Sequence, residues 1–152
     1  MKKQLIGLTL GLTLATGVVG SAFAQANPAT LVKQRQSTMT LQGKYFFPLF
    51  AMASGRAPYD ATVVARNTVF LESLTQMAWD GFNPSTTNEK SNALPKIYED
   101  AAGFKASQDK LHAEMGKLAA AAKSGNEAGA KAAIGEVGKV CGSCHDTYRA
   151  KS

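Results

Sequence analysis

The chain has 152 residues, of which 45% are hydrophobic and 18% are charged. This size and composition fit one ordinary domain with a normal core, which excludes a multidomain protein and an intrinsically disordered chain. The 17 Lys and Arg outnumber the 11 Asp and Glu and give a net charge of +6. Because the basic residues form no run outside Lys2 and Lys3, the charge does not indicate a nucleic-acid-binding protein.

The first 24 residues have the features of an export signal. Lys2 and Lys3 form a basic start, residues 5–19 are apolar apart from Gly and Thr, and residues 22–24 read Ala-Phe-Ala, a small-x-small cleavage pattern. The alternative, an uncleaved membrane anchor, is disfavoured by three glycines in the apolar stretch and by the cleavage pattern. We therefore expect a cleaved signal peptide over residues 1–24 and an exported domain over residues 25–152, with no membrane segment in the mature chain.

The mature chain predicts an all-α domain of four amphipathic helices. Apolar residues recur at spacings of three, four and seven, and the helices are expected at residues 29–53, 61–80, 95–122 and from 127 to the C-terminus. Asp60 and Asn126 are the expected N-caps of the second and fourth helices, and Pro48 is expected to kink or split the first helix near Lys44. Helices of this length with short connections predict an antiparallel up-down-up-down four-helix bundle.

The last predicted helix contains Cys141-Gly142-Ser143-Cys144-His145. Both cysteines continue the apolar stripe of this helix, and His145 lies four residues after Cys141 on the same side. C-x-x-C-H is the attachment pattern of c-type haem, in which two thiols add to the porphyrin vinyl groups and the histidine binds the iron. We therefore expect one haem c, bound covalently through Cys141 and Cys144, with His145 as the proximal iron ligand.

Three other uses of the cysteines fit less well. A thioredoxin-like pair places its first cysteine at a helix N-terminus, whereas about fifteen predicted helical residues precede Cys141. A zinc site needs four ligands, and only His112 remains as a further nitrogen donor. A structural disulfide would not require His145.

The order and spacing of several short segments resemble the cytochrome c prime family, the class II cytochromes c. The segments are Lys33–Ser37, Ala57–Asp60, Trp79–Phe82, Lys117–Ala122 and Cys141–Arg149, and they cover nearly the whole mature chain. The resemblance implies a high-spin, five-coordinate haem with His145 as its only axial protein ligand. It also implies a periplasmic homodimer that binds nitric oxide and often carbon monoxide and is not an enzyme, with electron transfer to redox partner proteins as a further role.

On the distal side of the haem, the resemblance implies three residues of the first helix. Met39 would close the distal face, and Arg35 and Gln36 would lie at the haem edge near the propionates. Met39 has two other interpretations: a side chain that only packs in the core, or a sixth iron ligand that makes the protein a low-spin electron-transfer cytochrome. Its offset from Arg35 resembles the non-ligating pattern, so we expect an open iron site. Taken alone, Arg35 would be a solvated surface charge.

The resemblance also places Trp79 and Phe82 in the lining of the haem cavity and Arg149 on the proximal side. From the residues alone, Trp79 is a core residue near a helix end and Arg149 is a solvated charge four residues after His145. His112 falls just off the apolar stripe, and we expect it to be exposed and not to bind iron. Three phenylalanines, Phe46, Phe47 and Phe50, fit either the core or a hydrophobic dimer face.

Overall fold

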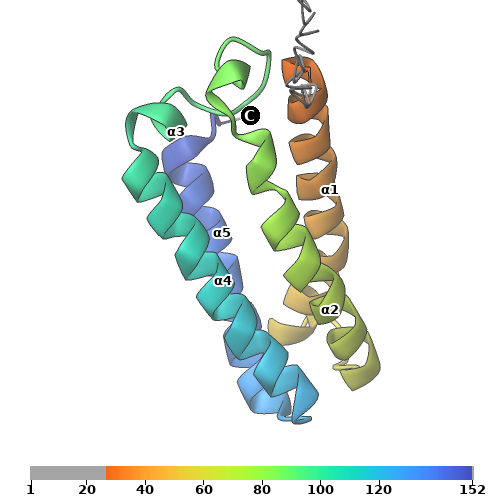
Figure 1. The fold of residues 1–152 in the computed structure, drawn as a ribbon. Coiled ribbons are helices and arrows are strands. Elements are labelled where there is room, and N and C mark those ends of the chain that lie inside the picture. Colours follow the sequence, from red (N-terminus) through yellow and green to blue (C-terminus); the bar gives the residue numbers. More distant parts are fainter. Residues whose placement is uncertain (1–26, 152) are drawn as a thin grey trace, which may run out of the picture.

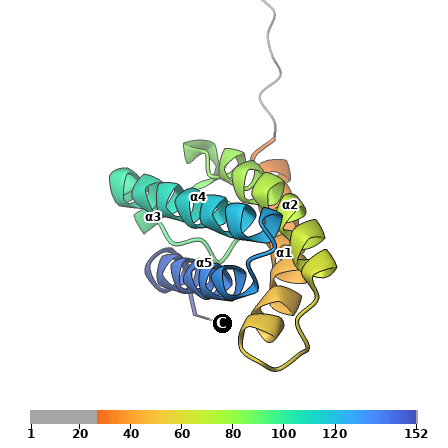
Figure 2. The same cartoon turned by 90° about the horizontal axis from the view of Figure 1, so that it is seen from below.

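The structure is a computed structural model that describes residues 27–151, so the expected signal segment lies outside the described residues. Four long helices pack side by side as a bundle (Figure 1): α1 (Pro28–Ala53), α2 (Ala61–Met77), α4 (Ala101–Lys123) and α5 (Glu127–Tyr148). Contacts join α1 to α2, α2 to α4, α4 to α5 and α5 to α1, around a common interior (Figure 2). Successive long helices run in opposite directions, which confirms the predicted bundle (Figure 1). None of the helices between residues 27 and 151 is long and apolar enough to cross a membrane.

The predicted N-caps set the starts of two helices. Asp60 Oδ1 accepts a hydrogen bond of 2.8 Å from the backbone N–H of Thr62, and Asn126 Oδ1 accepts one of 3.0 Å from Gly129. Each bond satisfies a backbone N–H that has no partner within the first helical turn. α4 ends before Gly125, which adopts a φ of 70° that residues with a Cβ rarely tolerate.

Pro48 does not split α1, so this alternative was wrong, and a kink near Lys44 stays a prediction. The helix runs unbroken from Pro28 to Ala53 with Pro48 inside it. Pro48 has no backbone N–H, so it cannot donate a hydrogen bond to the carbonyl of Lys44. The Asn67 side chain of α2 donates a 3.0 Å hydrogen bond to the adjacent carbonyl of Tyr45. Leu49, the next residue, is completely buried. Packing against α2 therefore keeps this turn helical.

The predicted third helix is two helices. α3 (Lys96–Glu99) is separated from α4 by Asp100, whose φ of −117° and ψ of 57° are not helical. The Asp100 side chain accepts a 3.0 Å hydrogen bond from the backbone N–H of Gly103 and caps α4. It also accepts a 2.8 Å bond from the Tyr148 hydroxyl at the end of α5. The hydrogen bond between Asp100 and Tyr148, which are 48 residues apart in the sequence, therefore helps to set where α4 begins.

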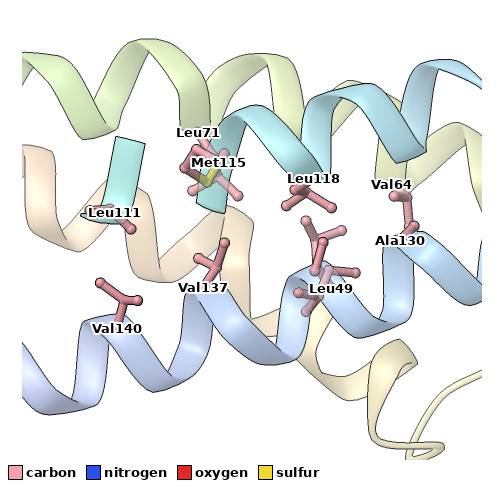
Figure 3. Packing of buried hydrophobic residues seen from close by; sticks show 11 residues of the cluster. Leu49, Val64, Leu71, Leu111, Met115, Leu118, Ala130, Val137 and Val140 are labelled. Atoms are coloured by element: carbon pink, nitrogen blue, oxygen red, sulfur yellow. The ribbon is translucent and has the colours of Figure 1, made fainter. Parts of the chain in front are cut away.

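The connection between α2 and α3 also differs from the prediction. α2 ends at Met77 rather than near residue 80, and two single-turn 3₁₀ helices follow, Trp79–Gly81 and Pro84–Thr86. This connection lies at the same end of the bundle as the start of α1 and the C-terminus (Figure 1). Near the other end, aliphatic side chains from all four long helices form a continuous core (Figure 3), in which Leu49, Val64, Leu118 and Ile134 have no exposed surface.

Candidate functional site

A cavity of about 560 Å³ lies inside the bundle, with α1 and α5 among its walls. Its size falls within the range of small-molecule and cofactor sites, ~300–1,000 Å³. The structure places all nine predicted site residues around this cavity: Arg35, Gln36, Met39, Trp79, Phe82, Cys141, Cys144, His145 and Arg149. Residues that are more than 100 positions apart in the chain are therefore neighbours here. What each residue does at the cavity stays a prediction.

Both cysteines lie on the cavity side of α5 as half-buried free thiols. Val137 and Val140, which precede them on the same face, are buried. Burial, together with the neighbouring Cys144, raises the pKa of the Cys141 thiol to about 11, and burial also raises the pKa of Cys144. A thioredoxin-like pair needs the opposite shift, because its reactive cysteine is a thiolate near neutral pH. The environment therefore argues against a thiol-redox pair and suits a pair of apolar thioethers.

His145 lies at the exposed side of the cavity, one residue after Cys144. Partial removal from water and the nearby charge of Arg149 lower the pKa of the imidazole, although Asp146 opposes this shift. Neutral imidazole is therefore favoured at neutral pH, and this is the form that binds a metal ion. The motif thus presents two thiols and one metal-binding nitrogen to the same cavity.

Arg149 lines the cavity, but not as part of α5. The helix ends at Tyr148, and Arg149 has an extended backbone that forms an isolated bridge with Ala93. Two hydrogen bonds extend this contact: the N–H of Leu94 donates to the Tyr148 carbonyl (2.9 Å), and the N–H of Ala150 donates to the Asn92 carbonyl (2.8 Å). The prediction that the last helix continues to the C-terminus was therefore wrong.

Arg35 is buried, with 3% of its surface exposed, so its interpretation as a surface charge was wrong. Nη1 donates to the Gly81 carbonyl at 2.7 Å and to Thr86 Oγ1 at 2.9 Å, and Nη2 donates to Ser91 Oγ at 2.9 Å. A side chain at position 81 would not fit, because its Cβ would lie 2.6 Å from the Cβ of Arg35. The four salt bridges found within residues 27–151 leave out Arg35, so its hydrogen-bond partners are all neutral.

Such a buried cation without a negative partner costs free energy. An anionic group at the adjacent cavity would offset this cost. The guanidinium also lies 4.5 Å from the centre of the Phe82 ring, which adds a weaker favourable contact.

An aromatic cluster forms one wall of the cavity. The Phe82 and Phe104 ring centres are 5.1 Å apart, and the Trp79 ring centre lies 6.1 Å from that of Phe82 and 6.0 Å from that of Phe104. His112 supports this wall from outside: Trp79 Nε1 donates a 3.0 Å hydrogen bond to His112 Nε2. The expectation that His112 is exposed was therefore wrong, since it is half-buried beneath the indole.

The polar loop before Pro95 also contributes to the cavity wall. In the structure, Ser91, Asn92 and Ala93 line the cavity, and Ser91 binds Arg35. Small polar residues in a loop carry no distinctive pattern, so sequence gave no signal for them. The inner wall includes Leu71, Leu111 and Met115, which the spacing of apolar residues could have indicated.

The wall formed by α1 has no histidine, lysine or carboxylate among its cavity-lining residues. Met39 lies in this wall and is the only sulfur-containing residue of α1 in the described lining, since Met52 packs against the main core. Phe46 packs against the main core, whereas Phe47 and Phe50 are exposed. The three phenylalanines therefore do not share one environment.

The chemistry of the lining fits a haem. Two half-buried thiols and a neutral imidazole stand on one helix, apolar side chains form most of the walls, and a buried guanidinium lies at the rim where an anionic group would be stabilised. These are the groups needed to tether a porphyrin, to bind its iron and to neutralise a propionate.

Comparisons with known proteins agree with this fit. The family model described as Cytochrome C' matches residues 30–149. Cytochrome c' from Rubrivivax gelatinosus is 42% identical over 82% of this chain and 97% of its own length. Cytochrome c' from Alcaligenes xylosoxydans xylosoxydans is 40% identical over 83% of this chain and 98% of its own. A solved nitric oxide complex of a mutant of cytochrome c prime from Alcaligenes xylosoxidans has a TM-score of 0.78 and 40% identity, covering 84% of this chain and 99% of that one.

Proposed function

Because this chain belongs to the cytochrome c prime family, we propose that it binds nitric oxide or carbon monoxide at a five-coordinate haem iron. The family consists of non-enzymatic haem proteins, and the haem c of this chain is attached through Cys141 and Cys144. When bound, the haem would supply an iron that can take up small neutral molecules in its ferrous state. A mutant of cytochrome c prime from Alcaligenes xylosoxidans forms a complex with nitric oxide, which supports the same ligand class here.

The proximal side of the site is α5. His145 is the proposed iron ligand, because the imidazole lies next to the two attachment points and is favoured in its neutral form. Arg149 follows four residues later, beyond the end of α5, and its charge lowers the pKa of the imidazole and so favours the unprotonated form. Arg35 is proposed to bind a haem propionate together with Gln36, which is exposed at the same cavity.

The distal side carries the functional argument. Arg35 is the one charged residue that α1 places in the described lining, and its guanidinium is bonded to Gly81, Thr86 and Ser91. The polar side chains nearer Met39 are also engaged, because Thr40 donates to the Gln36 carbonyl and Gln42 to the Leu74 carbonyl. A polar ligand would lose hydrogen bonds to water there without replacement, at a cost of ~1–3 kcal/mol by protein mutational data. A neutral diatomic molecule carries little such cost. This engagement of the polar groups around Met39 is the single observation that favours gas binding.

A second function remains a candidate because of Met39 itself. Its thioether lines the cavity from α1, a different helix from the one that carries His145, and could bind the iron as a sixth ligand. The protein would then be a low-spin electron-transfer cytochrome whose iron does not take up carbon monoxide.

The ferrous absorption spectrum with and without carbon monoxide distinguishes the two functions, and two variants sharpen it. We expect a high-spin spectrum that changes with carbon monoxide. Met39→Leu should leave both properties unchanged, since leucine keeps the apolar bulk but cannot bind iron, while Met39→Ala should speed ligand entry. Conversion from low to high spin in both variants would identify Met39 as an iron ligand and refute gas binding at an open site.

Location and assembly complete the proposal. We propose that residues 1–24 direct export to the periplasm and are removed, which the intact mass of the periplasmic protein tests.

We also propose a homodimer through exposed apolar side chains on α1 and α2, namely Leu41, Val69, Phe70 and Met77. Sedimentation of the haem-loaded protein should give twice the chain mass, and charged substitutions at these positions should give the single chain. Redox partner proteins are proposed only as a further role.

A further inference from the structure

Phe47 combines two properties that rarely occur together. It is the most exposed of the large apolar side chains described, at 69%, and it also lines the cavity. Phe50, less than one turn further along α1, is exposed at 37% but does not line the cavity. A single exposed phenylalanine elsewhere on a protein surface is common, whereas one at the mouth of the functional cavity can restrict the entry of ligands.

Gly43 makes room for the Phe47 ring. In an α-helix a long side chain points back toward the N-terminus, over the residue four positions earlier. The ring of Phe47 accordingly lies over Gly43, where a Cβ would come within 3.1 Å of Phe47 Cε2. Glycine within an exposed helix costs about 1 kcal/mol relative to alanine. Glycine at position 43 therefore lets the Phe47 ring keep this position, whereas a Cβ would shift the ring by a few tenths of an ångström.

Phe47 is also the largest of four residues that follow one another along one face of α1, and the other three are small or polar. Gln36, Thr40, Gly43 and Phe47 are spaced by four, three and four residues, so they share one face of α1, and all four line the cavity. The Thr40 hydroxyl is bonded to the Gln36 carbonyl at 2.9 Å and so stays close to its own helix. Along this face of α1, Phe47 therefore offers the largest apolar side chain to the cavity mouth.

Two neighbours of Phe47 in α1 contact α5 near the first attachment point of the haem. Phe46 and Phe50 approach Gly138 of α5, where a Cβ would be 3.4 Å from each ring. Gly138 lies three residues before Cys141, so this contact sets α1 and α5 close together at that level. Phe47 stands beside this contact, on the exposed side of the cavity.

We propose that Phe47 sets the upper size of ligands that reach the distal side of the haem, and that Gly43 seats its ring for this purpose. This inference rests on the proposed gas-binding function. A diatomic molecule passes beside the ring, whereas a longer molecule must displace it. Phe47 is therefore a specificity-determining residue that acts on entry and not on the iron.

Association of two probes with the ferrous haem-loaded protein tests the inference: carbon monoxide as the small ligand and n-butyl isocyanide as the large one. Phe47→Ala should raise the isocyanide association rate about tenfold and the carbon monoxide rate by no more than about threefold. Gly43→Ala, which favours the helix but crowds the ring, should slow the isocyanide. The crystal structure of haem-loaded Phe47→Ala should show the distal space open to solvent on this side.

Phe50→Ala is the matched control, because it removes an exposed ring of the same size from the same helix but not from the cavity lining. It should change neither rate. Equal acceleration of both probes by Phe47→Ala, no acceleration, or the same effect from Phe50→Ala would overturn the inference while leaving gas binding intact. If the unaltered protein takes up no carbon monoxide, the proposed function itself fails and this inference falls with it.

Discussion

The two halves of the bundle interior are built differently. The packed end, around Leu49, Val64, Leu118 and Ile134, is filled by aliphatic side chains from all four long helices (Figure 3). The cavity end, beyond Met115 toward the C-terminus of α5, is lined by aromatic rings, two thiols, an imidazole and a buried guanidinium. The same helices therefore complete their own core at one end and leave space for a cofactor at the other.

The lining of the cavity shows why the second end depends on its cofactor. The cavity of about 560 Å³ is partly open to solvent, with the exposed side chains of His145 and Phe47 among its lining residues. Most of the remaining lining is apolar, so water that enters in place of a haem finds few hydrogen-bond partners there. The haem therefore also packs the cavity end, in addition to being its functional group.

The largest effect is therefore expected when haem attachment is prevented. In Cys141→Ala/Cys144→Ala, the free energy of unfolding should fall by at least about 4 kcal/mol, the stabilisation given by a ligand at 1,000 times its Kd. Amide hydrogen exchange should show that the loss is uneven: amides near Val64 and Leu118 should stay protected longer than those near Arg35 and Tyr148.

Leu118→Ala is the control from the packed end. Truncating a fully buried leucine should cost ~2–5 kcal/mol while leaving the haem spectrum unchanged. Uniform loss of protection in the cysteine variant, or thermal stability equal to that of the haem-loaded protein, would show that the two ends are not independent.

A smaller effect is expected from Arg35, and its sign is informative. If an anionic haem group compensates the buried charge, Arg35→Met should lower the free energy of unfolding of the haem-loaded protein by ~1–3 kcal/mol, as for other lost buried hydrogen bonds. If nothing compensates the charge, methionine should be neutral or stabilising, as in other replacements of buried charges by apolar residues. Chemical denaturation of both proteins at neutral pH separates these outcomes.

The sequence predicted the packed end better than the cavity end, and the reason is the range of the interactions. Asp60 and Asn126 cap their helices through bonds two or three residues away, so local pattern sufficed. Arg35 is buried by partners 46 to 56 residues away, in a loop without a recognisable pattern. No local signal distinguishes such an arginine from a solvated one.

The helix boundaries show the same division. The stripe from Ile97 to Phe104 suits one continuous helix, and only the distant Tyr148 hydroxyl reveals why Asp100 interrupts it. At Pro48 the distant contact has the opposite effect: contacts with α2 keep the helix continuous although proline locally tends to break it. The haem motif was predicted because its chemistry lies within five consecutive residues, whereas the cavity around it is assembled from the whole fold.

The smallest predicted effect concerns the bond that closes the cavity end, between Asp100 and Tyr148. The hydrogen bonds from Tyr148 and from the backbone of Gly103 lower the pKa of Asp100. A carboxyl group with a lowered pKa contributes stability that is present above its unfolded pKa of about 3.9 and is lost as the pH falls through the folded value. Asp100→Asn should therefore lower the melting temperature slightly at pH 7, and the difference from the unaltered protein should shrink toward pH 3.

Tyr148→Phe supplies the control, since it removes the donor and leaves the carboxylate. At pH 7 the effects of Asp100→Asn and Tyr148→Phe should not add in the double variant, because both act on one hydrogen bond. Additive effects, or a melting-temperature difference as large at pH 3 as at pH 7, would mean that the contact contributes nothing through its charge. The start of α4 would then be fixed by the backbone bond of Gly103 alone, and the cavity end would depend on the haem for its closure as well as its core.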